Sequence, residues 1–162
     1  MNRIFFILLT SFLFTQCSVS KNNSSTQPKK LNENEQQEIA VSKNNQEKQL
    51  NGIWHFEYFT MNIQNVNLLF PFSVPTLNFD IKNKQFSGTT GCNNISGKIM
   101  LNADKIQFIE PIMMTRMSCN ARGEAIFVEY LKQIQSYSIE GQILKLIGLE
   151  GKPYFIMKRS EG

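Results

Sequence analysis

Few residues of this chain have the types that catalysis or metal binding requires. The 162 residues include one histidine, His55, and three cysteines, Cys17, Cys92 and Cys119. The sequence contains neither the G-x-S-x-G motif of serine hydrolases nor the H-E-x-x-H motif of zinc proteases. His55 lies beside Trp54 in a stretch that predicts a strand, and its presence alone leaves a Cys-His or Ser-His site open. We expect no enzyme activity, no cofactor and no metal.

Cys92 and Cys119 are expected to form a disulfide. If Cys17 is modified as argued below, these two remain in an exported domain, where disulfides persist. Closing a loop of about 27 residues stabilises a fold by roughly 3.5 kcal/mol on the chain-entropy model. Two buried free thiols are the main alternative. A metal site built on Cys92 and Cys119 would lack further ligands, because the sequence around neither cysteine contains a C-x-x-C motif or a histidine.

The glycine-rich stretch 88–97 contains Asn93 and Asn94. Glycine allows positive φ and close backbone approach, so the stretch predicts a tight turn or a bulge. Asn side chains cap backbone groups in such turns, so we expect structural contacts of Asn93 and Asn94, with a ligand-binding loop as the alternative. A phosphate cradle would need a helix directly after the loop, whereas strand patterns follow here.

Arg116 lies in a methionine-rich stretch, residues 113–117. If its neighbours are buried, its guanidinium needs a partner such as Glu110, Glu124 or a backbone carbonyl. A structural ion pair is the default expectation, and an anion-binding site is the alternative. The methionines lack a regular Met-x-x-Met repeat, so we expect them to fill the core rather than to bind a soft metal such as copper.

Residues 1–16 have the features of an export signal. Arg3 is followed by eleven uncharged residues, Ile4 to Phe14. A bilayer-spanning helix needs about 20 apolar residues, so this run is short for a permanent span but suits a signal peptide. The next residues, ending in Cys17, resemble the lipobox of bacterial lipoproteins, which implies cleavage before Cys17 and lipidation of its thiol and amino groups. Simple secretion is the alternative.

Residues 17–50 are expected to form the lipidated cysteine and a disordered linker. Residues 18–50 contain eleven Asn or Gln and no aromatic residue. Such a composition buries too little apolar surface to offset its ordering entropy, although a transient helix near 33–43 is compatible with it. A linker of this length reaches about 30 Å on average.

Residues 51–162 form the expected folded domain. Fourteen aromatic residues lie here, and eleven Lys or Arg stand against nine Asp or Glu. The resulting charge of +2 argues against a protein that follows nucleic-acid phosphates, so no nucleic-acid partner is expected.

The pattern of this domain predicts a mainly β fold. Short alternating runs separated by turn residues predict strands near 53–59, 76–82, 85–88, 96–101, 105–109, 136–140, 143–147 and 154–158. A stripe of apolar residues at helical spacing predicts one helix over 121–135, with Asn120 as its N-cap and its apolar face in the core. We expect a curled antiparallel sheet or a small barrel with this helix packed on it.

The aromatic segment 70–75 is bounded by prolines at positions 71 and 75. We expect it to pack over one end of the barrel. If exposed, it would instead contact a partner or lipid.

Three motifs together resemble the META domain, the family of the heat-shock-protein HslJ-like lipoproteins. They are Leu50-Asn51-Gly52-Ile53-Trp54, Gly88-Thr89-Thr90-Gly91-Cys92-Asn93-Asn94-Ile95-Ser96-Gly97 and Met113-Met114-Thr115-Arg116-Met117-Ser118-Cys119. The resemblance covers about residues 50–158. It implies a compact barrel of lipocalin-like topology with one helix, an envelope location and an association with stress or antibiotic tolerance. It implies no enzyme activity, because the family has no established reaction.

These observations predict an envelope lipoprotein that serves as a non-enzymatic binding or maintenance module. Its expected partners are the membrane, through the lipid anchor, and an unknown envelope protein. We expect a monomer held at the outer membrane and facing the periplasm. The alternative is a small barrel that carries an apolar ligand. A filled interior would favour the module, and an internal pocket of a few hundred Å³ would favour the carrier.

Overall fold

The computed structural model describes residues 33–61, 65–119 and 122–161. These residues belong to one compact unit, Asn32–Gly162. The predicted signal segment, Cys17 and the predicted N-cap Asn120 lie outside the described residues. Within the described part, no helix is long and apolar enough to cross a membrane.

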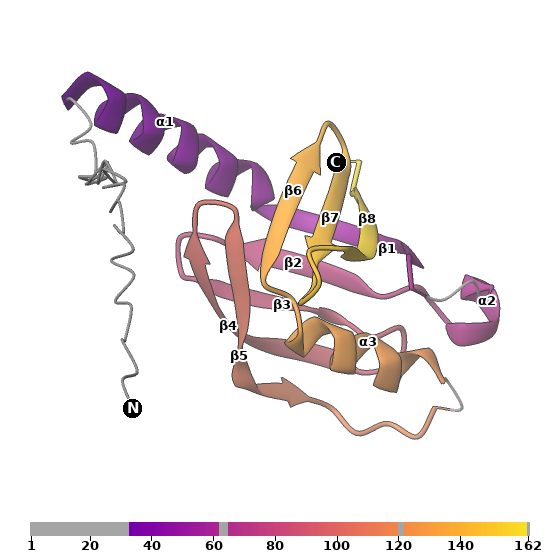
Figure 1. The fold of residues 1–162 in the computed structure, drawn as a ribbon. Helices are drawn as coiled ribbons and strands as arrows, with labels where there is room; N and C mark the ends of the chain where they lie inside the picture. Colours follow the sequence, from indigo (N-terminus) through magenta and orange to yellow (C-terminus); the bar gives the residue numbers. More distant parts are fainter. Residues whose placement is uncertain (1–32, 62–64, 120–121, 162) are drawn as a thin grey trace, which may run out of the picture. The chain divides into compact units, whose positions relative to one another are not determined.

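Eight antiparallel strands form a closed barrel, so the predicted mainly β fold is confirmed (Figure 1). Neighbours in the chain are neighbours in the sheet, and β1 pairs with β8 to close it. The strands are β1 Gly52–Phe59, β2 Thr76–Asp80, β3 Gln85–Thr89, β4 Asn94–Asn102, β5 Lys105–Met114, β6 Ser136–Glu140, β7 Ile143–Ile147 and β8 Pro153–Arg159.

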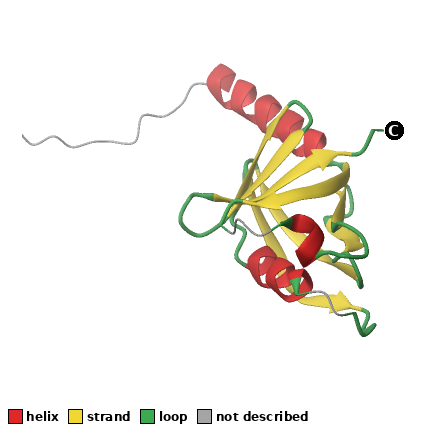
Figure 2. Ribbon diagram, turned by 90° about the vertical axis from the view of Figure 1, so that its right-hand side faces the viewer, coloured by secondary structure: helices red, strands yellow, loops and turns green. Residues whose placement is uncertain are grey.

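The barrel wall is weakest between β5 and β6, where the only paired residues are Lys105 and Ser136. Helix α3, Gly123–Lys132, lies beside the rest of β5 (Figures 1 and 2). Its Lys132 pairs with Glu110 of β5 at 2.7 Å. The predicted helix is confirmed, with its ends at 123 and 132 rather than 121 and 135, and its apolar stripe does face the core.

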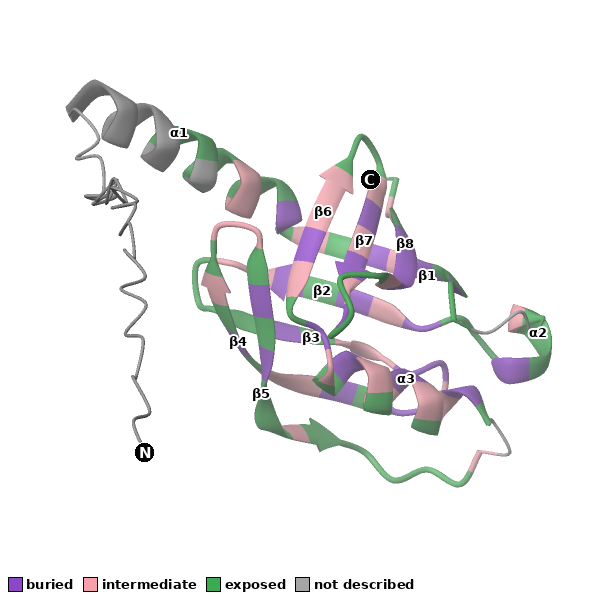
Figure 3. Ribbon diagram, viewed as in Figure 1, coloured by how far each residue is buried: buried purple, intermediate pink, exposed green. Residues whose placement is uncertain are grey.

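Aromatic side chains fill the interior of the barrel. The rings of Phe56, Phe59 and Phe155 contact one another with centroids 4.6 to 6.1 Å apart. Phe127 of α3 reaches the same cluster, with its ring 5.1 Å from that of Phe155. Figure 3 shows how buried and exposed residues alternate along the strands, as a sheet with one face in the core requires.

Helix α1, Glu33–Leu50, stands where the composition predicts a disordered linker. Its last turn is fixed by long-range contacts. Leu50 is fully buried, and the indole N–H of Trp54 donates to its carbonyl at 2.9 Å. Arg159 of β8 donates to two carbonyls at the end of the helix, and Glu47 accepts a hydrogen bond from the turn between β4 and β5. The linker expectation is wrong for this stretch, because local composition does not reveal such contacts.

Between β1 and β2 the chain forms the short helix α2, Val66–Leu69, and then the aromatic segment 70–75. Phe70 is buried against the core, as expected, whereas Phe72 is exposed. The expectation that the segment packs over the barrel end is therefore right for Phe70 and wrong for Phe72.

Candidate functional site

The side chain of Asn93 is the centre of a buried polar network at one end of the barrel. It lies in the loop between β3 and β4 and is 1% exposed. Its amide nitrogen donates to both carboxylate oxygens of Glu124 at 3.0 and 2.9 Å and to the carbonyl of Met117 at 3.2 Å. Its amide oxygen accepts from the Met117 N–H at 2.7 Å and from the Thr115 hydroxyl at 2.8 Å. One amide thus joins the loop, α3 and the strap, which we define as residues 115–119.

Thr90 and Glu124 complete this network. The hydroxyl of fully buried Thr90 contacts the Glu124 carboxylate and accepts from the backbone N–H of Asn93. Glu124 lies in the first turn of α3, where the helix dipole favours a negative charge. Hydrogen bonds to its carboxylate come from the loop, so its charge is held by donors rather than by a cation. The expected structural role of Asn93 agrees with this arrangement.

Cys92 and Cys119 lie at disulfide distance next to this network. Their Cα atoms are 6.2 Å apart and the structure joins the two sulfurs. The disulfide therefore ties the same loop to the end of the strap that Asn93 already holds.

The methionines around Arg116 are exposed, so the expectation that they fill the core is wrong. Met113 is 65% exposed, and Met114 and Met117 are exposed as well. The end of β5 pairs with β4 on one side and lies beyond the pairing with β6 on the other, and the side chains of Met113 and Met114 point to solvent.

Arg116 does not form the expected ion pair. The expectation assumed that the neighbours of Arg116 are buried, whereas its side chain is exposed to solvent. Of its two suggested partners, Glu110 pairs with Lys132 and Glu124 binds Asn93. Among the described residues, Arg116 has no ion-pair partner.

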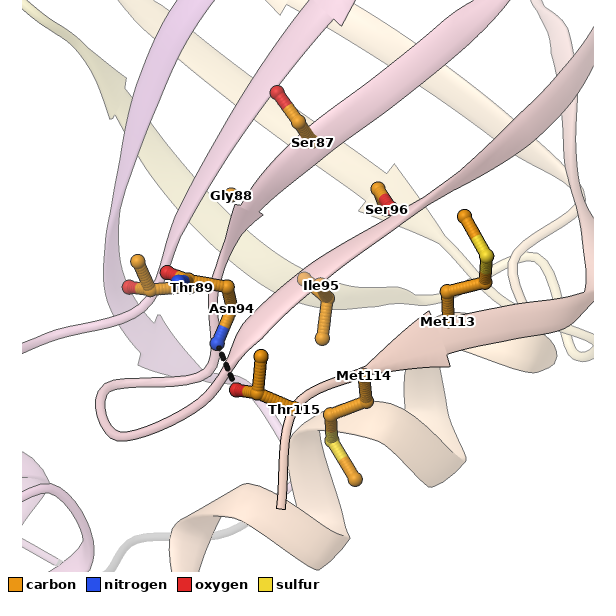
Figure 4. A pocket seen from close by; sticks show the side chains of 9 residues that line it. All are labelled: Ser87, Gly88, Thr89, Asn94, Ile95, Ser96, Met113, Met114 and Thr115. Carbon is orange, nitrogen blue, oxygen red and sulfur yellow. Dashed lines mark hydrogen bonds between the residues drawn. The ribbon is translucent and has the colours of Figure 1, made fainter. Parts of the chain in front are cut away.

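A groove of about 640 Å³ runs over the outer face of β3, β4 and β5 (Figure 4). Short side chains floor it, including Ser87 and Ser96, and Asn94 lies at one end with its backbone N–H bonded to the Thr115 hydroxyl at 3.0 Å. We call it the outer groove, and its lining residues are Ser87, Gly88, Thr89, Asn94, Ile95, Ser96, Met113, Met114 and Thr115. The wall is uneven here because the β4–β5 register shifts between Ser96 and Lys98.

The outer groove was not predicted from the sequence. Part of its signal was available, because four nearby strand positions, Ser87, Thr89, Asn94 and Ser96, carry short hydroxyl or amide side chains where an exposed sheet face commonly carries charge. Asn94 follows Asn93 in the same motif, but the two side chains differ in their surroundings. Asn93 is buried and structural, whereas Asn94 is exposed and can meet a ligand.

His55 lies on β1. It lines a shallow cavity of about 330 Å³ on the outer wall together with Glu57 and Ser160. No hydrogen bond among the described residues joins His55 to either of them, although a nucleophile–base pair requires one. In the same part of the chain, no three His, Cys, Asp or Glu side chains are grouped as metal ligands.

Comparison with known proteins agrees with this architecture. The family model of the META domain matches residues 49–161. An NMR structure of a protein from Burkholderia xenovorans is similar, with a TM-score of 0.58 and 20% identity over 72% of this chain and 87% of that one. A crystal structure of a DUF4847 family protein from Bacteroides vulgatus has a TM-score of 0.51 and 15% identity, covering 70% of this chain and 95% of that one. No curated protein sequence matches the chain. At these identities the two structures share the fold.

Proposed function

This chain belongs to the META domain family, and we propose that it is a non-enzymatic binding module of the cell envelope that acts through the outer surface of its barrel. The filled interior carries this proposal. The side chains of Trp54, Phe127 and Phe155 are fully buried, and they occupy the core that an internal ligand would otherwise fill. The outer groove is open to solvent and offers both hydroxyl and thioether contacts.

The packed interior argues against the alternative, a barrel that carries an apolar ligand inside. A carrier needs an internal space of several hundred Å³ lined by apolar side chains. Here the ring contacts of 5 to 6 Å between Phe56, Phe127 and Phe155 occupy the centre. The cavities with fully described linings include exposed residues of the outer wall, such as Ser87, Gln107 and Glu57.

The proposed location is the outer membrane, facing the periplasm, with the anchor on Cys17. The lipobox resemblance supports it, and two or more acyl chains hold a protein stably where a single chain does not. Helix α1, with 18 residues at 1.5 Å each, would then act as a spacer of about 27 Å. The proposed role in stress or antibiotic tolerance is supported by the family resemblance.

The outer groove can be tested in a strain that lacks this protein. Complementation with Ser96→Trp fills the groove with a bulky side chain. The matched control is Ser138→Trp, also on an outward position of a strand but away from the groove. We expect the wild type and Ser138→Trp to restore survival under heat or antibiotic challenge, and Ser96→Trp to fail. Equal survival of both variants would contradict a role for the groove.

The anchor can be tested by the intact mass of the protein purified from its native membrane. We expect a mass that matches residues 17–162 plus acyl chains. Cys17→Ala should move the protein to the soluble fraction. An unlipidated mature mass in the soluble fraction of the wild type would contradict the anchor.

A further inference from the structure

We propose that the barrel end formed by α2 and segment 70–75 binds the surface of an anionic phospholipid bilayer, with Leu68 and Phe72 entering the interface. The contact is distinct from the lipid anchor proposed on Cys17, and it would survive removal of that anchor. It is also distinct from the outer groove, which no residue of this segment lines.

Leu68 and Phe72 are the most exposed large apolar side chains at this end, at 78% and 68%. Their neighbours Leu69 and Phe70 are buried at 2% and 4%. The Phe70 ring lies 5.4 Å from that of Phe56 in an edge-on contact. The segment is therefore held firmly by its inner residues while it presents the two outer ones to solvent, so their exposure does not come from poor packing.

Leu68 and Phe72 lie in an uncharged stretch of the sequence. Residues 60–75 contain no Asp, Glu, Lys or Arg. Ser73 donates to the carbonyl of Gly91 at 3.0 Å, which joins this segment to the loop that carries Asn93. The strap and the start of α3 adjoin that loop, and there the one nearby carboxylate, Glu124, is engaged by Asn93.

Two arginines supply the charge of this end. Arg116 of the strap and Arg122 at the start of α3 are both exposed, and neither has an ion-pair partner among the described residues. A guanidinium binds phosphate with two parallel hydrogen bonds, and each cation near an anionic leaflet strengthens binding to it. The exposed thioethers of Met114 and Met117 add apolar surface beside them.

Exposed apolar side chains, unpaired arginines and missing carboxylates match the chemistry of an anionic bilayer interface. The segment also projects outward. A fluid bilayer adapts to such a surface.

The test uses the full chain with Cys17→Ala, which removes the anchor. Leu68→Cys carries an environment-sensitive fluorophore on the only free thiol, since Cys92 and Cys119 are joined. Met100→Cys with the same fluorophore is the matched control, because Met100 is an exposed apolar residue of β4 near the turn to β5. Vesicles contain phosphatidylcholine alone or a mixture with phosphatidylglycerol.

We expect a blue shift at position 68 with the anionic vesicles, a weaker one with phosphatidylcholine and none at position 100. Phe72→Ser, and separately Arg116→Gln with Arg122→Gln, should each lower the affinity for anionic vesicles about tenfold. Both leave the core intact, so unfolding midpoints should stay unchanged. No shift at position 68, or equal shifts at both positions, overturns the proposal, and a missing shift would direct the search to a protein partner.

Discussion

The side chain of Asn93 joins three segments that are distant in the sequence. The motif around it predicts a capping role, and the structure agrees. The sequence does not predict its partners, because Glu124 lies 31 residues away and Thr115 lies 22 residues away. Only the closed barrel brings them to one end.

Replacing Asn93 should destabilise the fold strongly. Asn93→Ala removes one of the donors to the Glu124 carboxylate, which keeps Thr90, and the side-chain partner of two backbone groups of Met117. A polar group that loses its hydrogen-bond partner on burial costs about 1–3 kcal/mol. We expect the free energy of unfolding in urea to fall by about 3 kcal/mol. Asn94→Ala, at the exposed neighbour, is the control and should change it by less than about 0.5 kcal/mol. Equal losses in the two variants would contradict the structural role of Asn93.

Tyr137 is a second buried residue whose role the sequence does not show. It is 1% exposed, and among the described residues its hydroxyl has no hydrogen-bond partner. Burial raises the pKa of Tyr137 to about 12, and the negative charges of Glu47 and Asp104 act in the same direction. The hydroxyl therefore stays neutral in the folded protein at a pH where an exposed tyrosine has ionised.

The stability of the protein should reflect this pKa. The unfolded chain releases the Tyr137 proton near pH 10 and the folded chain near pH 12, so the free energy of unfolding falls as the pH rises between these values. Tyr137→Phe should remove this contribution to the decrease in the free energy of unfolding at high pH. Because the substitution also deletes a buried hydroxyl without a partner, it should stabilise the protein at pH 7 by about 1 kcal/mol. Urea unfolding at pH 7 and pH 11 measures both effects. Tyr58→Phe, at an exposed tyrosine, should leave both quantities unchanged. A loss of stability at pH 7 in Tyr137→Phe would contradict this view of the hydroxyl.

At the scale of elements, α1 is a helix that the composition of its residues does not predict. Residues 18–50 carry too few apolar side chains to predict a stable helix, yet Leu50 is buried and Arg159 binds the carbonyls at the helix end. Arg159 lies in β8, 108 residues after Asn51, and only folding brings it to the end of the helix. The helix α3 was predictable because its own stripe of apolar residues carries the signal.

The strap is held twice, by Asn93 and by the Cys92–Cys119 disulfide. On the chain-entropy model, Cys92→Ser with Cys119→Ser should lower the free energy of unfolding by about 3.5 kcal/mol. The fold should persist, because the hydrogen bonds of Asn93 to Met117 remain. Titration of the denatured, unreduced Cys17→Ala chain should find no free thiol. Two free thiols per chain would refute the disulfide.

At the scale of the whole molecule, the sequence predicts the fold class because alternation and turns mark each strand. Closure of the barrel depends on the β1–β8 pairing, for example of Phe59 with Phe155, and no local pattern encodes it. The exposed groove and the exposed methionines were missed for a related reason. The sequence shows that Met113 is apolar, but only the arrangement of β5 and β6 shows that nothing covers it.

We propose that this barrel is closed to ligands inside and recognises partners from its outer surface. Trp54 is the single tryptophan, it is fully buried, and its indole N–H is bonded to the Leu50 carbonyl, so its signals report on the core. The most direct measurement follows the Trp54 fluorescence and its indole N–H resonance while a long-chain fatty acid is titrated into the protein. We predict that neither signal changes. A saturable shift of both at one fatty acid per chain would contradict the claim and identify the protein as an internal carrier.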